Sequence, residues 1–234
     1  MTTLLEKDLL WRELNDRSTN FEKSMDALHR KQTGSYYTAL DLTILMMKEL
    51  VDSLPLTTRE RLYTKTFLEP CVGTGNFVYA YLRVCKDLGF SHEENTELLK
   101  NIYVCDINTQ ALSVYQENMT MIAKEWFNIL LDQAYFDSHI GTGLLFDVDA
   151  ERIQYISIED VFPAEIVKNG FDIVVTNPPY KNLKAERSHY KSDVLHAQDK
   201  EKYATIGKLA GKHFSYSTTG VLNIYKLFVE EIVD

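Results

Sequence analysis

The sequence predicts an open α/β fold, and three short apolar segments are the basis of this prediction. The segments end near Glu69, Asp106 and Thr176, and each leads into a turn of glycine, polar or proline residues. Helical patterns follow the first two turns, whereas two prolines follow the third and end its strand, because proline cannot donate to a sheet ladder. Open α/β sheets bind ligands at the carboxyl ends of their strands, so these turns mark the expected site.

Length and composition limit the classes of protein to which the chain can belong. The chain has 234 residues, of which 45% are hydrophobic and 25% are charged, as is usual for one globular domain with or without an appendage. No apolar run is long enough to predict a transmembrane helix, and the first residues do not resemble a signal peptide. The three cysteines have no metal-like spacing, so we predict no metal site and a reducing, cytoplasmic setting.

The charge is unevenly distributed along the chain. The formal net charge of −9 argues against a stand-alone nucleic-acid clamp, because contacts to phosphates need lysine and arginine. Residues 181–213 nevertheless carry eight Lys/Arg and four Asp/Glu. A polyanion could pass beside this basic segment, and a solvated lysine-rich loop is an equally good interpretation of the charge alone.

The amino-terminal part is predicted to be helical. Residues 1–32 have apolar side chains at helical spacings and form a predicted helical extension, with residues 33–234 as the main domain. A turn with two tyrosines, Tyr36 and Tyr37, precedes a predicted helix that Thr38 or Asp41 would cap. A free helix amino terminus beside a threonine hydroxyl can hold a carboxylate, although an ordinary capped helix is the alternative.

The segment 66–78 reads as a strand, a glycine turn and the start of a helix. Gly73 and Gly75 would let the backbone pass close to a ligand, and Asn76 is the expected helix cap. Val78 stands where the dinucleotide-binding pattern has its third glycine, which counts against NAD as the ligand.

Two further strands are expected before the proline turn. In residues 101–108 a buried strand ends at Asp106, which could accept both ribose hydroxyls of a nucleoside, and Asn108 would cap the next helix. Residues 140–145 are predicted to form a strand edge, followed by a solvated acidic loop. Residues 221–234 are predicted to form the last helix.

The residues from Asn177 to Tyr180, with the sequence Asn-Pro-Pro-Tyr, suit chemistry on a planar exocyclic amine. The side-chain oxygen of Asn177 and the carbonyl of Pro178 can accept the two N–H bonds of such an amine. That favours a pyramidal nitrogen, whose lone pair can point at an electrophilic methyl group. Tyr180 offers a face for stacking, whereas the simpler reading is a proline turn that only ends a strand.

In combination, these motifs resemble the gamma-class N6-adenine-specific DNA methyltransferases of restriction–modification and related phage-defence systems. The resemblance rests on Gly34-Ser35-Tyr36-Tyr37-Thr38, Glu69-Pro70-x-x-Gly73-x-Gly75-x-Phe77, Asp106 and Asn177-Pro178-Pro179-Tyr180. It implies a class I, Rossmann-like methyltransferase fold that uses S-adenosylmethionine. It also implies that residues 33–234 form the catalytic core and that the target adenine is flipped out of double-stranded DNA.

The resemblance also implies roles for individual residues. Cofactor contacts are expected from Tyr36, Tyr37, Thr38, Glu69, Pro70, Cys71, Gly73, Gly75, Asp106, Ile107, Thr142 and Asn177. Catalytic roles are expected for Asn177, Pro178, Pro179 and Tyr180, with Tyr180 stacking on the flipped base. Thr142 stands where an acidic residue or an asparagine often contacts the cofactor adenine, so this contact could be weaker or come from elsewhere.

The family's sheet continues with three more strands and a target-recognition domain. We therefore expect either that this chain is the amino-terminal part of a larger enzyme or that a second polypeptide completes it. The strand at 171–176 would then be an exposed sheet edge, and the chain alone would bind the cofactor weakly without methylating DNA.

Three other functions remain open. A protein N5-glutamine methyltransferase uses the same tetrapeptide on another planar amide, although the motif at residues 34–38 and the basic segment favour the DNA enzyme. An RNA adenine methyltransferase is a weaker option. A non-catalytic subunit that binds S-adenosylmethionine is the alternative from another class.

Overall fold

The computed structural model describes residues 8–25, 37–148, 152–187, 190 and 192–233. In these residues the strands are β1 (Phe67–Glu69), β2 (Ile102–Cys105), β3 (Ile140–Gly141), β4 (Leu145–Val148), β5 (Ile153–Ile156) and β6 (Ile173–Val174). The helices are α2 (Leu9–Ser24), α4 (Leu40–Ser53), α5 (Leu56–Arg59), α6 (Asn76–Asp87), α7 (His92–Lys100), α8 (Thr109–Phe127), α9 (Gln133–His139), α10 (Ile158–Val161), α11 (Ala164–Val167), α12 (Asp193–His213) and α13 (Ile224–Val233). One 3-10 turn covers Leu62–Thr64. None of these helices is long and apolar enough to cross a membrane.

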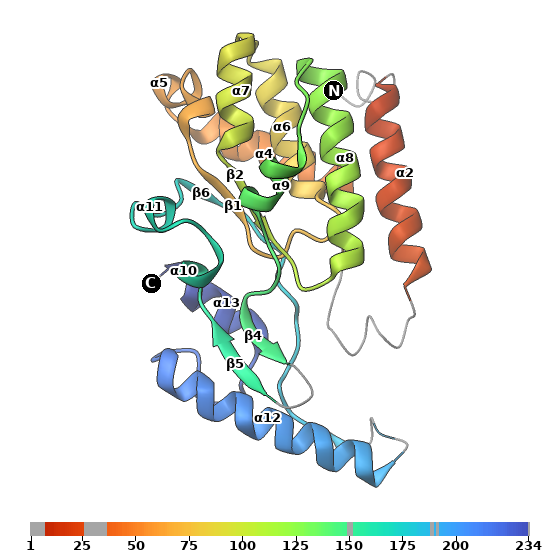
Figure 1. Ribbon diagram of the computed structural model, residues 1–234, viewed down its shortest axis with the longest axis vertical. Helices are drawn as coiled ribbons and strands as arrows, with labels where there is room; N and C mark the ends of the chain where they lie inside the picture. Colours follow the sequence, from red (N-terminus) through yellow and green to blue (C-terminus); the bar gives the residue numbers. More distant parts are fainter. Residues whose placement is uncertain (1–7, 26–36, 149–151, 188–189, 191, 234) are drawn as a thin grey trace.

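A parallel sheet lies at the centre of the fold (Figure 1). Its strand order is β3-β2-β1-β6, and every neighbouring pair is parallel. Strands β4 and β5 form a separate antiparallel hairpin. The predicted α/β class and Rossmann-like architecture are confirmed, because a parallel sheet with its connecting helices is the arrangement that this class requires.

The two central strands are buried on both faces, as parallel strands usually are. Side chains alternate along each strand, so Phe67, Ile102 and Val104 belong to one hydrophobic cluster. Leu68 and Tyr103 belong to another on the opposite face. We call these clusters the first core and the second core.

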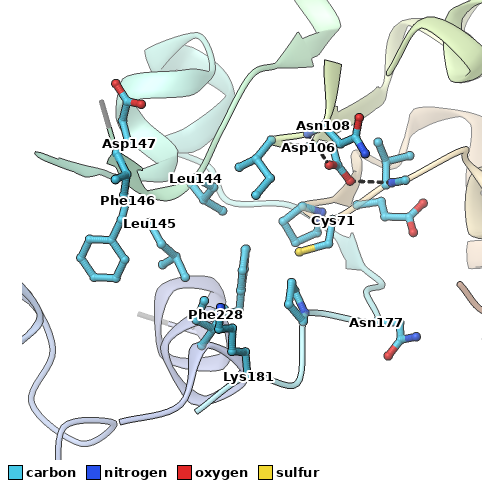
Figure 2. Close-up of a pocket in the computed structure, with 18 of the residues that line it drawn as sticks. Cys71, Asp106, Asn108, Leu144, Leu145, Phe146, Asp147, Asn177, Lys181 and Phe228 are labelled. Carbon is cyan, nitrogen blue, oxygen red and sulfur yellow. Dashed lines mark hydrogen bonds between the residues drawn. The ribbon is translucent and has the colours of Figure 1, made fainter. Parts of the chain in front are cut away.

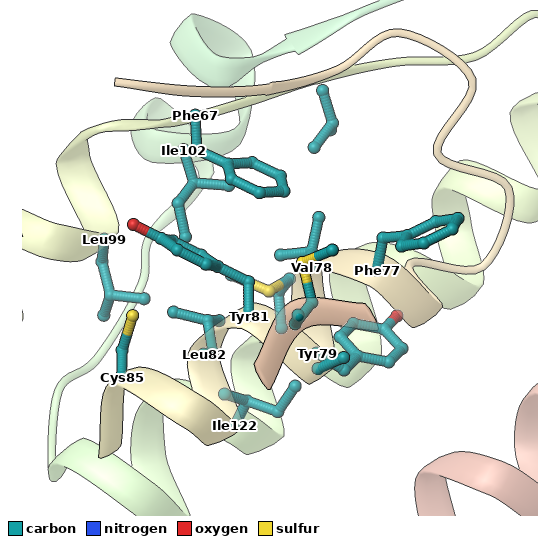
Figure 3. Close-up of a cluster of buried hydrophobic side chains, with 14 of the residues drawn as sticks. Phe67, Phe77, Val78, Tyr79, Tyr81, Leu82, Cys85, Leu99, Ile102 and Ile122 are labelled. Carbon is teal, nitrogen blue, oxygen red and sulfur yellow. The ribbon is translucent and has the colours of Figure 1, made fainter. Parts of the chain in front are cut away.

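The first core lies between the sheet and helices α2, α4, α6, α7 and α8 (Figure 1). Residues 77–82 of α6 are all buried, which is typical of a helix in the interior of a fold. The ring of Phe67 stacks on that of Tyr81 with centroids 4.5 Å apart, and Figure 3 shows these side chains together. The predicted extension takes part, because Trp11 and Leu14 of α2 are buried in the same core.

The second core is smaller and contains residues of the hairpin, α12 and α13. Polar contacts reinforce it. Glu230 of α13 accepts hydrogen bonds from the backbone N–H groups of Ser215, Tyr216 and Ser217 at 2.6 to 3.0 Å. These bonds hold the loop between α12 and α13 against α13.

Several local predictions are confirmed. Helix α8 begins after Asn108, whose side chain accepts hydrogen bonds from the N–H groups of Gln110 and Ala111. The glycine turn joins β1 to α6, and the last predicted helix corresponds to α13, which begins three residues later than expected, at Ile224.

The predicted helix caps at two positions are wrong. Ala39, with no side-chain cap, precedes α4, so neither Thr38 nor Asp41 has that role. Gly75 precedes α6, and Asn76 is its first helical residue. The polar side chains of Thr38 and Asn76 make tertiary hydrogen bonds instead, which are described with the site.

Three other elements differ from expectation. The predicted strand at 171–176 is reduced to β6, which is one of the two edge strands of the described sheet. Next to it, Asp172 binds Lys65 and Thr66 through its side chain. The basic segment contains the long helix α12 rather than a loop, and Asp147 of the predicted acidic loop lies in the β4–β5 hairpin. The other predicted loop acids, Asp149 and Glu151, lie outside the described residues.

Candidate functional site

A cavity of about 710 Å³ opens at the carboxyl ends of β1, β2 and β6 (Figure 2). Its volume is within the range of small-molecule binding pockets. The three turns predicted from the sequence meet there, since Glu69, Asp106 and Asn177 all line the cavity. Tyr37, Thr38, Pro70, Cys71, Gly73, Ile107 and Pro179 line it as well.

Asp106 fixes the glycine turn to the end of β2. Its Oδ2 accepts a hydrogen bond from the N–H of Gly73 at 2.7 Å, and its Oδ1 accepts one from Asn108 at 2.8 Å (Figure 2). Burial raises the pKa of Asp106, and the hydrogen bonds from Asn108 and Gly73 oppose this rise. The carboxylate oxygens have further lone pairs, with which they could accept hydroxyl donors of a ligand.

The two glycines of the turn make room for tyrosine rings. Gly73 has a φ of +53°, and a Cβ atom there would lie 2.5 Å from the ring of Tyr37. Gly75 has a φ of +101°, and its Cβ atom would lie 2.5 Å from Tyr79 and 2.6 Å from Tyr115. Gly73 lines the cavity and Gly75 does not. The turn therefore needs glycine for its backbone conformation and for internal packing.

Glu69 is a buried carboxyl group that faces the cavity. It is 2% exposed, and its Oε2 has no hydrogen-bond partner among the described residues. Burial raises the pKa of Glu69 well above its usual value; the charge of Asp106 adds to the rise, and a hydrogen bond from the backbone of Val78 opposes it. A cationic or hydrogen-bond-donating ligand would relieve this unfavourable burial.

The strand end that carries Asn177 is tied to the first core by side-chain hydrogen bonds. The Nδ2 of Asn177 donates to the Oγ1 of Thr38 at 3.0 Å. The backbone oxygen of Thr38 accepts a hydrogen bond from the Nδ2 of Asn76 at 2.8 Å. The Oδ1 of Asn76 in turn accepts from the hydroxyl of Ser18 in α2. These contacts fix the orientation of the Asn177 amide.

Besides Gly75, three predicted residues lie outside the cavity, and one more lies outside the described part of the chain. Thr142 lines a separate, smaller pocket beside α8 and α9. Tyr180 is 58% exposed and stacks on Tyr225. Pro178 is buried but is not a cavity residue. Tyr36 belongs to the residues that the structure does not describe.

Sequence reasoning missed the far wall of the cavity. This wall consists of residues 145–148 of β4, Lys202, Tyr203 and Ile206 of α12, and Ile224 and Phe228 of α13. Lys181 also lines the cavity, with its Nζ 5.5 Å from the centre of the Tyr203 ring. A signal was present, because the buried residues Tyr203, Ile206 and Ala210 have helical spacing.

Comparison with known proteins identifies the family. Residues 100–234, more than half of the chain, match the family model described as Eco57I restriction-modification methylase. The chain belongs to this family. The match includes Asp106 and the residues from Asn177 to Tyr180, whereas Glu69 and the glycine turn lie outside it.

Among solved structures, the chain resembles one described as a cryoEM structure of a DrdV–DNA complex. The TM-score is 0.55 at 13% sequence identity, and the similarity covers 94% of this chain and 21% of that one. This chain therefore spans about a fifth of the length of the DrdV chain, and the likeness concerns the fold. No curated protein matches the sequence.

Proposed function

We propose that this chain carries the cofactor-binding and catalytic segment of a gamma-class DNA methyltransferase that transfers a methyl group from S-adenosylmethionine to adenine N6. The setting would be a restriction–modification or related defence system. Membership of the methylase family supports the reaction class. The observation that carries the proposal is the meeting of Glu69, Asp106 and Asn177 in one cavity at the carboxyl edge of the sheet.

The cavity suits the cofactor chemically. S-adenosylmethionine carries a sulfonium and an ammonium group, two ribose hydroxyls and a planar adenine. The buried carboxyl group of Glu69 matches the cations, and the half-buried carboxyl group of Asp106 matches the hydroxyls. Ile107 and Leu144 give the cavity apolar surface for a flat ring. When bound, the cofactor supplies an electrophilic methyl group.

The chain's own residues would prepare the target amine. The Oδ1 of Asn177 and the carbonyl of Pro178 would accept the two N–H bonds of the adenine amine. The hydrogen bond from Asn177 Nδ2 to Thr38 gives the amide one defined orientation, which such a role requires. Tyr180, at the surface next to this strand end, would stack on the flipped base.

Double-stranded DNA is the proposed substrate. The methyltransferase catalytic core would be residues 33–234, with residues 1–32 as a helical extension. We also propose that the rest of the methyltransferase, including a target-recognition domain, acts together with this chain, in the same or a second polypeptide. The DNA complex of the similar DrdV structure supports a DNA substrate.

Cofactor binding is the first test. Titration calorimetry of the chain with S-adenosylmethionine should detect binding that Asp106→Ala weakens about 10- to 100-fold, because hydrogen bonds to a charged group are lost. Asp137→Ala, on the exposed side of α9, is the matched control and should bind like the wild type. Unchanged affinity in a folded Asp106→Ala chain would contradict the proposed site.

Methyl transfer is the second test. Radiolabel from S-adenosylmethionine should enter adenine in plasmid DNA when the chain acts with the remaining part of its enzyme. Asn177→Ala should lower this transfer about 100-fold or more, which is a much larger effect than its effect on cofactor affinity. Label in a glutamine-bearing protein instead of DNA would favour the N5-glutamine methyltransferase, and unchanged transfer by Asn177→Ala would remove the proposed catalytic role.

A further inference from the structure

The ring of Tyr180 stacks on another aromatic ring of the same chain. Its centroid lies 5.4 Å from that of Tyr225, and the two planes are inclined by 17°. Tyr180 is 58% exposed and Tyr225 is 41% exposed, so the pair lies at the surface. Neither ring lines the large cavity.

Around Tyr180, successive side chains lie on opposite sides of the backbone. Pro179, Lys181 and Leu183 line the cavity, whereas Tyr180 does not. This alternation is that of an extended segment, in which successive side chains point to opposite sides. Asn177 also lines the cavity, so the proposed cofactor side and the aromatic pair are reached from the same short stretch of chain.

Backbone hydrogen bonds hold the two tyrosines in register. Residues 181–183 run antiparallel to residues 222–224, with a bridge between Asn182 and Asn223. The N–H of Leu183 donates to the oxygen of Leu222 at 2.9 Å, and the N–H of Ile224 donates to the oxygen of Lys181 at 3.0 Å. The residues directly before and after these pairs are Tyr180 and Tyr225.

Asn223 strengthens the same connection through its side chain. Its Oδ1 accepts a hydrogen bond from the N–H of Tyr225 at 2.8 Å, as a helix cap does, and its Nδ2 donates to the Oδ1 of Asn182 at 2.8 Å. Helix α13 itself is anchored by the buried side chains of Leu227 and Phe228. Tyr225, the second residue of α13, is therefore on a fixed support.

We propose that Tyr225 is a positioning residue that holds the ring of Tyr180 in place for stacking with the target base. This inference rests on the proposed function. A base between the two rings would separate them by about 7 Å, twice the 3.4 Å spacing of stacked bases, which exceeds the observed 5.4 Å. The base therefore stacks on the face of Tyr180 that points away from Tyr225.

The physical advantage is preorganisation. A lone, half-exposed tyrosine samples several rotamers, and a ligand must restrict them when it binds. Stacking on Tyr225 restricts the ring before the base arrives. Loss of the support should weaken stacking about two- to tenfold, which is the range of an aromatic pair.

Base stacking can be measured without knowing the recognition sequence. The probe is a single-stranded oligonucleotide with one 2-aminopurine, because an unpaired base needs no flipping. Its fluorescence should be quenched on titration with the 234-residue chain in the presence of S-adenosylmethionine. We expect Tyr225→Ala and Tyr225→Leu to weaken the quenching titration about two- to tenfold. Tyr225→Phe, which keeps the aromatic ring, should titrate like the wild type.

The controls separate positioning from folding and from the proposed function. Tyr216→Ala removes another tyrosine, 78% exposed on the neighbouring loop, and should titrate like the wild type. Calorimetric affinity for S-adenosylmethionine should be the same in all Tyr225 variants, which a general structural defect would not permit. If Tyr225→Ala and Tyr225→Leu titrate like the wild type while Tyr180→Ala loses the quenching, the positioning role of Tyr225 is overturned and the role of Tyr180 stands. Unchanged quenching by Tyr180→Ala, or no quenching by the wild type, also overturns the proposed role of Tyr180.

Discussion

Glu69 and Glu230 are both buried glutamates, but their surroundings shift their pKa values in opposite directions. Glu230, next to the second core, accepts hydrogen bonds from three consecutive backbone N–H groups. Burial alone would raise the pKa of Glu230, but the hydrogen bonds from Ser217, Tyr216 and Ser215 outweigh it and lower the pKa to about 2. Burial raises the pKa of Glu69 well above its usual value, and one of its oxygens has no partner in the described chain.

The difference separates a structural role from a binding role. A carboxylate with all its hydrogen bonds satisfied stabilises the fold, as Glu230 does for the loop before α13. A buried carboxyl group without them costs stability and persists where a ligand can supply the missing partners. Glu69 faces the cavity and Glu230 does not, which agrees with this distinction.

The largest expected effects are on the free energy of unfolding, for one substitution in each core. Among the described residues, the first core has 27 buried members and the second has ten. Phe67→Ala should lower the free energy of unfolding by about 3–5 kcal/mol, and Leu227→Ala by about 2–4 kcal/mol, because both side chains are completely buried. Urea denaturation measures both. Leu130→Ala, at a side chain that is 84% exposed, should stay within about 0.5 kcal/mol of the wild type.

Hydrogen exchange can sharpen the comparison of the cores. If the second core opens separately, Leu227→Ala should speed amide exchange in α12 and α13 while α6 and α8 stay protected. Equal acceleration in all four helices would mean that the two cores unfold as one unit.

A smaller effect is expected at Glu230. Glu230→Gln should cost about 1.5–3 kcal/mol at pH 7, because a charged acceptor of three N–H groups is lost. The folded pKa is lowered, so this stabilisation is complete above the usual pKa of 4.5 and disappears as the pH falls toward 2. Urea denaturation at pH 7 and pH 3 should show that the difference in the free energy of unfolding between the wild type and Glu230→Gln becomes smaller in acid. Glu201→Gln on the exposed side of α12 is the control, and a gap that grows in acid would contradict this account of Glu230.

Glu69 should give a change in stability of the opposite sign. Its folded pKa is raised, so its contribution to stability is complete below the usual pKa of 4.5 and is lost as the pH rises through the folded pKa. Glu69→Gln removes this titration and should unfold at nearly the same urea concentration as the wild type at pH 4. At pH 8 the variant should be the more stable chain while binding S-adenosylmethionine more weakly. A variant that is less stable at pH 8 would show that the Glu69 carboxylate supports the fold.

Local patterns were enough to predict the sheet and much of the cavity. The apolar segments before Glu69 and Asp106 do form neighbouring parallel strands, and Asn108 does cap α8. The turns meet because the carboxyl ends of parallel strands lie at one edge of a sheet. This follows from topology and needs no knowledge of side-chain contacts.

The errors arose where a side chain has a distant partner. Asn76 was predicted to cap its own helix, but its amide bonds to Thr38 and Ser18, which are far away in the sequence. The pairing of residues 181–183 with residues 222–224 depends on the path of the intervening helix α12, which charge counting did not predict. Thr142 precedes Gly143, whose φ is +105°, and lines the pocket on the α8 side.

The hydrogen bonds of Asn76 have a practical consequence for anyone who shortens this protein. Through Asn76 and Thr38, the hydroxyl of Ser18 in the helical extension is linked to the amide of Asn177 by three successive hydrogen-bonded contacts. A boundary drawn at residue 32 looks harmless in the sequence, yet it removes the first member of this series. Trimming the amino terminus would therefore disturb the strand end that carries Asn177.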